Sequence, residues 1–286
     1  MSETINLIKQ ELKSYSSDKR KEHSKIYFKT GKGEYGEGDK FLGISMPDIR
    51  TVVKKYAKKI QLDNIDELLK SKFHEERMCA LLLLSNKFNK HLNLAYNKRK
   101  RIAQLAKLGV IVDEFDEVLP SENLAKECKD FYLSHTSYIN NWDLVDTTCQ
   151  DILGTWILYC NKINGNIKNI ECDLAQAVTT DSINQILFDL SKSDDIWERR
   201  ISIVTCIALV KKHCYHQCKI ISSELLSDKN DLINKAVGWA LREMGKVNKE
   251  ELDLFLQNHI NDMSRTTLRY AIEKYPENER LEWLRA

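Results

Sequence analysis

Glycine and proline are scarce in this chain, with 10 and 3 occurrences among 286 residues. Average soluble proteins contain about 7% Gly and 5% Pro, and strand-rich folds need these residues for tight turns. Leu, Ile, Lys, Glu and Asp dominate long stretches instead. The composition therefore predicts an all-α protein.

Long apolar segments and a secretion signal are also lacking. The longest apolar run, Met78–Leu84, is far shorter than the ~20 residues that cross a bilayer. The start of the chain, Met1–Ile5, has no basic segment followed by an apolar core. We expect a cytoplasmic protein without membrane association, in which the eight scattered cysteines stay free thiols. We also expect a monomer with one domain over residues 1–286.

The chain has no strong excess of charge, since 44 basic and 42 acidic residues leave a net charge of +2. Bulk electrostatics therefore do not indicate a polyanion binder, and the distribution of charge matters more than its sum. Basic clusters occur at Lys54–Lys55 with Lys58–Lys59, at Lys98–Arg101 and at Lys211–Lys212. For each cluster alone, a solvated helix face is the simpler interpretation.

Signatures of cofactor and nucleophile chemistry are missing or incomplete. Residues Gly31–Gly38 contain a literal G-x-G-x-x-G, but no predicted strand precedes it and its two glutamates would repel a pyrophosphate. No Walker A lysine and no G-x-S-x-G follow. Around His213–Cys218, two cysteines four apart lie near two histidines, but no second cluster completes a zinc site. We expect no metal and no nucleotide cofactor.

Apolar residues recur at three- and four-residue spacing through most of the chain, which indicates amphipathic helices. The first contains Ile5–Leu12, and another begins near Pro47. Further helices are predicted at about 121–134, 142–161, 181–192, 196–212, 216–226, 230–244, 249–258 and 264–274. Such a series favours a curved superhelical solenoid of HEAT-like antiparallel helix pairs. Its concave face could hold a duplex or a protein.

Three stretches place a tryptophan and a charge on one helix face. The pairs are Trp142 with Asp146, Trp197 with Arg200, and Trp239 with Arg242. An aromatic plane beside an anion suits a cation, and a guanidinium suits a phosphate. Core packing is the commoner fate of an indole.

The acid next to Trp142 has an ordinary structural interpretation. Asp143 suits the first turn of a helix, where the dipole favours an anion. Asp146, nearly a full turn further along, fits that role less well.

Four segments resemble the bacterial AlkD-like DNA alkylation repair enzymes. They are Tyr138–Asp146, Ser193–Ile203, Asp231–Glu243 and Ser264–Lys274, and they occur in the family's order. The glycine-rich loop leading to Phe41–Pro47 is also similar. The likeness extends from about residue 27 to residue 276, although the region 91–128 is longer than is usual in the family.

The resemblance implies a curved array of HEAT-like repeats that holds duplex DNA containing alkylated bases. It implies a monofunctional glycosylase that removes N3- and N7-alkylated purines without metal or cofactor, acting from the backbone side while the base stays stacked. The family's catalytic aspartate would fall on Asp146 and its two lesion-flanking tryptophans on Trp142 and Trp239.

The resemblance also implies a DNA-binding set. The backbone-binding arginine would fall on Arg200, and a tyrosine of the N-terminal helices on Tyr27. Basic residues of the matching segments complete the set: Lys235, Arg242 and Arg269. A family glutamine appears here as Ser45, so that contact cannot be transferred.

These residue types suit the chemistry. Alkylation at N3 or N7 makes the purine a cationic leaving group, and the sugar becomes an oxocarbenium ion that an ionised Asp146 could stabilise. Two other functions stay open from the residues alone. One is a non-catalytic HEAT-like protein that binds damaged or branched DNA, and the other is a protein-interaction scaffold.

Overall fold

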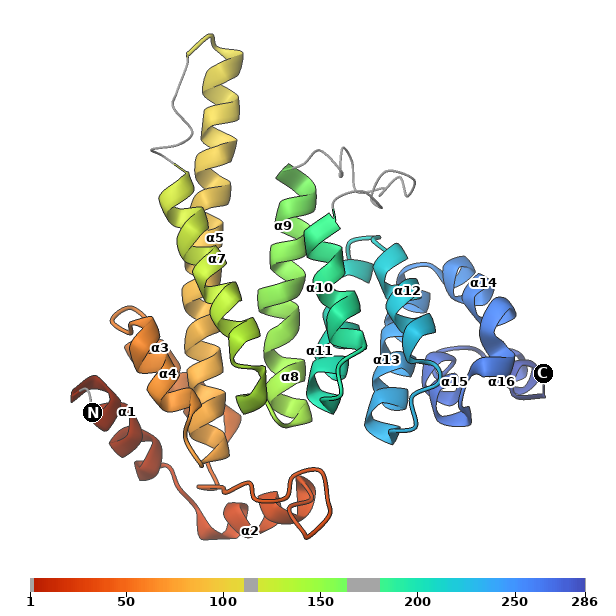
Figure 1. The fold of residues 1–286 in the computed structure, drawn as a ribbon, viewed down its shortest axis with the longest axis horizontal. Coiled ribbons are helices and arrows are strands. Elements are labelled where there is room, and N and C mark those ends of the chain that lie inside the picture. Colours follow the sequence, from red (N-terminus) through yellow and green to blue (C-terminus); the bar gives the residue numbers. More distant parts are fainter. Residues whose placement is uncertain (1–2, 111–117, 164–180, 286) are drawn as a thin grey trace. The chain divides into compact units, whose positions relative to one another are not determined.

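Helices make up nearly all the regular structure (Figure 1). The computed structural model describes residues 3–110, 118–163 and 181–285, and within these ranges extended backbone pairs only at one isolated bridge, between Lys40 and Phe73. The prediction of an all-α protein is confirmed. The packing of the chain divides it into two units, Met1–Leu144 and Val145–Ala286. The single domain over residues 1–286 stays a prediction.

The first unit is organised around one long helix, α5, which packs against α3, α4 and α7. At 34 residues, α5 includes much of the region that is unusually long for the family. The remainder of that region, where the structure describes it, belongs largely to α7, which lies along α5 (Figure 1). The helices are α1 (Glu3–Ser14), α2 (Asp18–Tyr27), α3 (Met46–Tyr56), α4 (Leu62–Leu69), α5 (His74–Lys107), α7 (Leu119–Ser134) and the short η1 (Thr136–Tyr138).

Helix α8 (Trp142–Cys149) crosses the boundary between the units. It continues through a π-helical segment, η2 (Gln150–Gly154), into α9 (Thr155–Ile163). In the second unit α11 packs on α10, η2, α12 and α13, and α13 packs most extensively on α15. The remaining elements are α10 (Asp181–Ser191), α11 (Ile196–Val210), α12 (His216–Leu225), α13 (Asp231–Val247), α14 (Lys249–His259), η4 (Ile260–Asp262), α15 (Arg265–Ala271) and α16 (Glu277–Arg285).

Side-chain caps explain where several helices begin. The carboxylate of Asp195 accepts a hydrogen bond from the backbone N–H of Trp197 at 2.8 Å and caps α11. The Asn230 side chain accepts from the backbone N–H of Leu232 at 2.9 Å and caps α13. These bonds satisfy N–H groups that have no partner within the helix. Because Asp and Asn are favoured caps, the sequence predicts the first residues of α11 and α13 to within one position.

Helices α2 and α16 were not predicted. Neither has a buried residue, so both lack the apolar periodicity on which the other predictions depended. The start of α2 is fixed instead by Ser17, whose hydroxyl accepts from the backbone N–H of Arg20. Local capping and contacts with the following loop therefore replace core packing here.

Close packing between α13 and α15 requires a residue without a side chain at position 238. A Cβ atom added to Gly238 would lie 2.4 Å from the Cβ of Tyr270 and 2.6 Å from the carbonyl oxygen of Thr267. Both obstacles are rigid, because one belongs to backbone and the other is attached directly to it. Gly238 therefore sets the spacing of the two helices.

We predict that Gly238→Ala lowers the free energy of unfolding by about 1–3 kcal/mol, because a helix must shift to admit the methyl group. Urea denaturation measures the change. Gly31→Ala is the control, since its new Cβ meets only the flexible Glu34 side chain, and it should change stability by less than about 0.5 kcal/mol. Equal effects would show that helix spacing is not the cause.

Candidate functional site

Asp146 of α8 and Arg200 of α11 form a two-pronged ion pair. Nε of Arg200 donates to one carboxylate oxygen at 2.8 Å, and Nη2 donates to the other at 2.7 Å. The guanidinium also donates through Nη1 to the carbonyl oxygen of Leu232, at 2.7 Å. The side chain of Arg200 is 8% exposed and that of Asp146 is 17% exposed, so solvent reaches the carboxylate more readily than the guanidinium. The pair holds an oriented anion at a partly open position.

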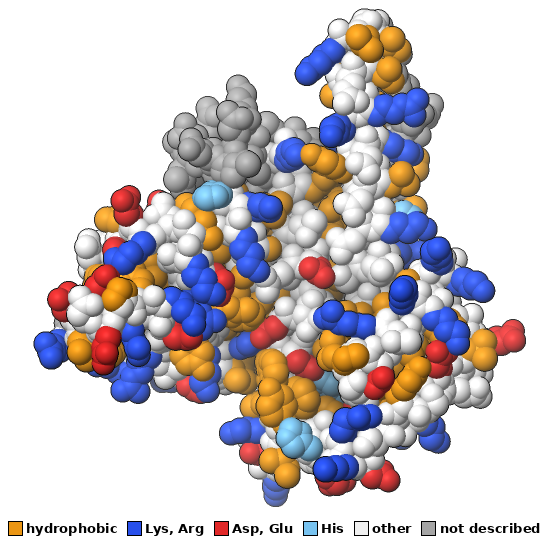
Figure 2. All heavy atoms as spheres, turned by 180° about the vertical axis from the view of Figure 1, so that it is seen from behind, with side chains coloured by type: hydrophobic (Ala, Val, Ile, Leu, Met, Phe, Trp, Pro, Cys, Tyr) orange, Lys and Arg blue, Asp and Glu red, His pale blue; other side chains and the backbone are white. Residues whose placement is uncertain are grey.

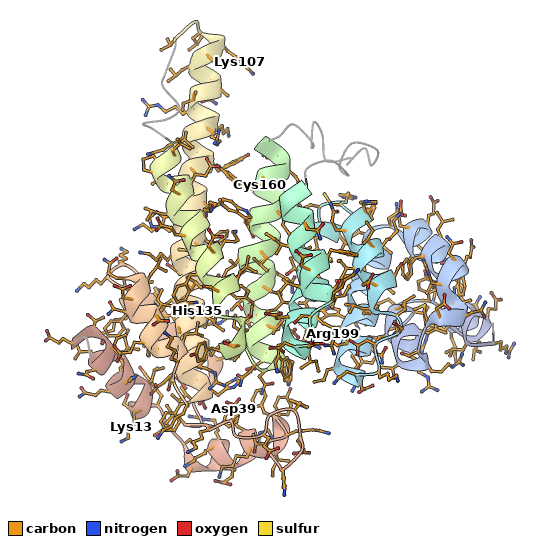
Figure 3. The ribbon with its side chains drawn as sticks, viewed as in Figure 1. Lys13, Asp39, Lys107, His135, Cys160 and Arg199 are labelled. Atoms are coloured by element: carbon orange, nitrogen blue, oxygen red, sulfur yellow. The ribbon has the colours of Figure 1, made fainter. Side chains whose placement is uncertain are left out.

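The first turn of α11 is fixed independently of that pair. Trp197 is only 6% exposed, so this indole belongs to the core and not to a ligand surface. Arg199, labelled in Figure 3, donates to the carboxylate of Asp228 at 2.7 Å and to the carbonyl oxygen of Ser193 at 2.8 Å. These contacts hold the helix end from which Arg200 extends.

Trp142, one helical turn before Asp146 on α8, is half-buried in an aromatic cluster of the first unit. Its ring stacks on Phe28 with centroids 5.5 Å apart and meets the edge of Tyr27 at 5.7 Å. The Trp142 side chain also hydrogen-bonds to the hydroxyl of Tyr35. The indole is therefore held in one orientation while part of it stays accessible.

A buried histidine fixes the start of α8. Nδ1 of His74 lies 3.0 Å from the carboxylate of Asp39, which is labelled in Figure 3, and Nε2 lies 2.8 Å from that of Asp143. Its ring packs against both Phe28, at 4.9 Å, and Phe41, at 4.8 Å, and these two rings also stack on each other, at 5.1 Å. With an acceptor at each nitrogen, the imidazole donates both hydrogen bonds only in its protonated form. Asp143 thus serves as an ion-pair partner, in addition to the helix-dipole role expected from its position.

The titration of this group follows from its surroundings. Burial lowers the pKa of His74, but the charges and hydrogen bonds of Asp143 and Asp39 outweigh that effect and raise it to about 9. Burial raises the pKa of Asp39, but His74 and Arg77 outweigh it, and the net change is downward. The His74 cation and the Asp39 anion are thus the stable forms at neutral pH.

Trp239 lies on α13. In the first turn of this helix, the carbonyl oxygen of Leu232 accepts a hydrogen bond from Arg200. The indole is half-buried, and its N–H donates to the carboxylate of Glu243 at 3.2 Å. Trp142 and Trp239 are thus both partly accessible, which distinguishes them from the buried Trp197.

The structure gives the predicted DNA-binding residues different surroundings. Arg242 forms an ion pair with Glu273, and Lys235 forms one with Asp231 at 2.7 Å. Arg269 is exposed on α15, and Tyr27 is 56% exposed at the end of α2. Arg200 pairs with Asp146, a contact that sequence analysis did not foresee.

The cysteine-rich segment His213–Cys218 is part of the fold. Cys214 and Cys218 are buried free thiols, and burial raises the pKa of the Cys218 thiol to about 12. Nδ1 of His213 lies 2.9 Å from the hydroxyl of Tyr215. In the described ranges no three His, Cys, Asp or Glu side chains are grouped as a metal site would need. Cys172 lies outside the described residues.

Comparison with known proteins shows the family. A family model described as DNA alkylation repair enzyme matches residues 8–275. The chain belongs to this family. The resemblance found in the four sequence segments is thereby confirmed, and family membership implies a DNA substrate.

The fold of this DNA alkylation repair family member is similar to that of a solved structure, a predicted DNA alkylation repair enzyme from Enterococcus faecalis. The TM-score is 0.60 at 15% identity, with 92% of this chain and 97% of the other covered. At that identity the likeness shows the fold alone. No curated protein matches the chain. Among the described helices, none has both the length and the hydrophobicity to cross a membrane.

The residues that hold the start of α8 were not predicted from the sequence. His74 and Arg77 lie in a segment without a motif, and Asp39 directly follows the glycine-rich loop; all three are far from Trp142 in the chain. Arg77 donates to Asp39 and, at 3.1 Å, to the side chain of Asn140. Charged residues at the start of a helix usually face solvent, so their burial could not be read from the sequence.

We predict that the His74 ion pairs stabilise the protein at low pH and lose that effect as pH rises. With a pKa of about 9 folded and about 6.5 unfolded, the contribution is complete below pH 6.5 and disappears through pH 9. The difference corresponds to roughly 3 kcal/mol.

Urea denaturation between pH 6 and pH 9.5 measures this, with His74→Gln as the matched variant. Glutamine keeps hydrogen-bonding capacity but cannot titrate. The difference in unfolding free energy between the two proteins should shrink as pH rises. A difference that is constant over this range would contradict a charged His74.

Proposed function

We propose that this protein is a DNA glycosylase that excises N3- and N7-alkylated purines from duplex DNA and leaves an abasic site. Family membership supports a DNA repair role. The observation that carries the proposal is Asp146, a partly exposed carboxylate that two hydrogen bonds from Arg200 hold in one orientation. A preorganised anion is what a reaction with a cationic transition state needs.

The substrate provides much of the driving force. An N3- or N7-alkylated purine is positively charged, so it leaves without protonation by a general acid. As the glycosidic bond breaks, positive charge moves to the sugar, where Asp146 stabilises the oxocarbenium ion and orients the attacking water. Each carboxylate oxygen has about two acceptor sites, so the bonds from Arg200 leave capacity for water.

The two accessible tryptophans suit a cationic nucleotide. A positive charge over an indole face is worth about 0.5–2 kcal/mol, depending on how well water is excluded. Trp142 is held by stacking on Phe28, and Trp239 by its bond to Glu243, so neither ring must be ordered when substrate binds. This preorganisation favours selection of alkylated over neutral purines.

Backbone contacts would come from the predicted basic residues. Arg200 uses three of its five N–H groups on Asp146 and Leu232, and its other two suit a phosphate oxygen. Arg269 and Tyr27 are exposed for such contacts. Phosphate would have to compete with Glu273 for Arg242 and with Asp231 for Lys235.

The alternative is a non-catalytic protein that binds damaged or branched DNA. Such a binder gains little from a carboxylate beside phosphates, since like charges repel. The accessibility of Asp146 therefore favours the enzyme.

We predict that Asp146→Asn lowers single-turnover release of base from duplex containing 7-methylguanine by at least about 100-fold, because the amide cannot stabilise the oxocarbenium ion by charge. DNA affinity should survive, since a repulsive anion is removed. Asp151→Asn, at an exposed position further along the same helical run, is the control and should release base at the wild-type rate. Full activity of Asp146→Asn would remove this residue from the mechanism.

We predict that Arg200→Lys slows base release about 10- to 100-fold, because an ammonium cannot bind both carboxylate oxygens in the guanidinium geometry. Arg199→Lys is the matched control, since its ion pair with Asp228 does not involve Asp146. It should slow base release far less than Arg200→Lys does, even if the melting temperature falls. If both variants were slowed equally, the effect would belong to α11 as a whole.

A further inference from the structure

The distribution of charge along α5 is one-sided. Between Glu76 and Asp113 the sequence has no Asp or Glu, but it has eight Lys and Arg residues. Seven of these lie from Lys87 to Lys107, and we refer to this part of α5 as the basic arm. In a chain whose net charge is only +2, this is a strong local concentration. The cluster Lys98–Arg101 is therefore part of a longer feature.

The basic arm projects from the first unit. Figure 1 shows α5 and α7 side by side, continuing beyond the ends of α3 and α4. Figure 2 shows Lys and Arg side chains along the projection and hydrophobic side chains at its tip. At the tip, Leu108 is 77% and Val110 46% exposed.

Four cations of the arm point away from α7. Lys90, Lys100, Arg101 and Lys107 are exposed, and none forms an ion pair with any residue in the described ranges. At 100° per residue they fall within an arc of about 120°, opposite the side that carries the buried Phe88, Leu92 and Ala95. From the first to the last the helix rises about 25 Å. The arm thus presents a line of positive charge.

Acidic residues of α7 do not cancel this line. Glu122 is paired with Arg99, and Asp130 is paired with Lys126 and Lys129. Glu127 is exposed on α7 and not on the arm. Among the described residues of this hairpin of helices, the field of the arm is therefore only weakly opposed. Four further acids, Asp113, Glu114, Asp116 and Glu117, follow the arm in the sequence and lie outside the described residues.

We propose that the basic arm binds the phosphate backbone of duplex DNA without reading its sequence. Over about 25 Å a duplex presents about 15 phosphates, ample for four cations. This inference rests on the proposed function because it takes duplex DNA as the ligand of the arm. It does not require that the protein excises bases. The arm adds affinity and length dependence to binding, while Asp146 and Arg200 act on the damaged nucleotide.

The test compares two variants with the same loss of charge. The arm variant changes Lys90, Lys100, Arg101 and Lys107 to Gln. The control variant changes Lys13, Lys54, Lys58 and Lys59 to Gln, which are also exposed and belong to the same unit. Figure 3 labels Lys107 near the tip of α5 and Lys13 on α1. Circular dichroism and melting curves establish that both variants fold.

Fluorescence anisotropy with undamaged duplexes of increasing length gives the affinity at several salt concentrations. We expect the arm variant to lose about 10- to 100-fold in affinity near 0.1 M salt and to show a salt slope shallower by about 2–4, since each phosphate contact contributes about 0.9. The ratio of the affinity for long duplexes to that for short duplexes should also be smaller in the arm variant than in the wild type. The control variant should change each quantity much less.

Three outcomes would overturn the inference. Equal losses in both variants would show that only net charge matters, and unchanged affinity of the arm variant would show that DNA does not touch the arm. Loss of binding to phosphatidylserine vesicles, with DNA affinity intact, would assign the arm to a lipid surface.

A base-release assay at saturating protein separates this inference from the proposed function. If the wild type releases no alkylated base but the arm variant still loses DNA affinity, the arm inference stands and the glycosylase proposal fails. If the wild type releases alkylated base and the arm variant binds DNA as tightly as the wild type, the glycosylase proposal stands and the arm inference fails.

Discussion

The pairing of the Asp146 carboxylate with the Arg200 guanidinium is the interaction on which the proposed chemistry depends. A carboxylate among packed helices loses much of its hydration, and an isolated one would tend to take up a proton. Two hydrogen bonds from a planar cation compensate for that loss and fix the direction of both oxygens. The bond from the same guanidinium to Leu232 connects this pair to α13.

A second cation acts at the start of the same helix. His74 holds Asp143 and Asp39, and its own charge depends on them. Removing one partner from a buried ion pair is much more costly than the net contribution of the intact pair, because the other charge is left without compensation. Asp143 and Asp146 of α8 are therefore each constrained by a cation from another helix, and Trp142 at its first position is constrained with them.

The basic arm shows why a net charge can hide an electrostatic surface. Lys and Arg residues on α5 and acids elsewhere in the chain cancel in the sum, but they lie on different helices. At physiological salt, screening over about 8 Å prevents distant acids from neutralising the arm. Charge on the arm would affect how DNA is captured, whereas the Asp146 pair would determine what happens to the damaged nucleotide.

Much of the fold was predictable from local physics. Scarcity of Gly and Pro indicated helices, and apolar periodicity placed most of their boundaries within a few residues, because each helix must bury one face. The predicted helix at 142–161 corresponds to the run from α8 to α9, although its π-helical segment left no signal. Helices α2 and α16 bury no residue, and the same reasoning did not predict them.

The helical class, the membership in the repair family and the choice of Asp146, Trp142 and Trp239 as candidates could all be inferred from the order of residues. The pairing of Arg200 with Asp146, 54 positions away, could not, since a guanidinium matches a carboxylate and a phosphate equally well. The burial of Trp197 in the core and of His74 as a cation likewise became evident only from the packed helices. The partner of a buried polar group depends on which helices pack together, and helices that pack together can be far apart in the sequence.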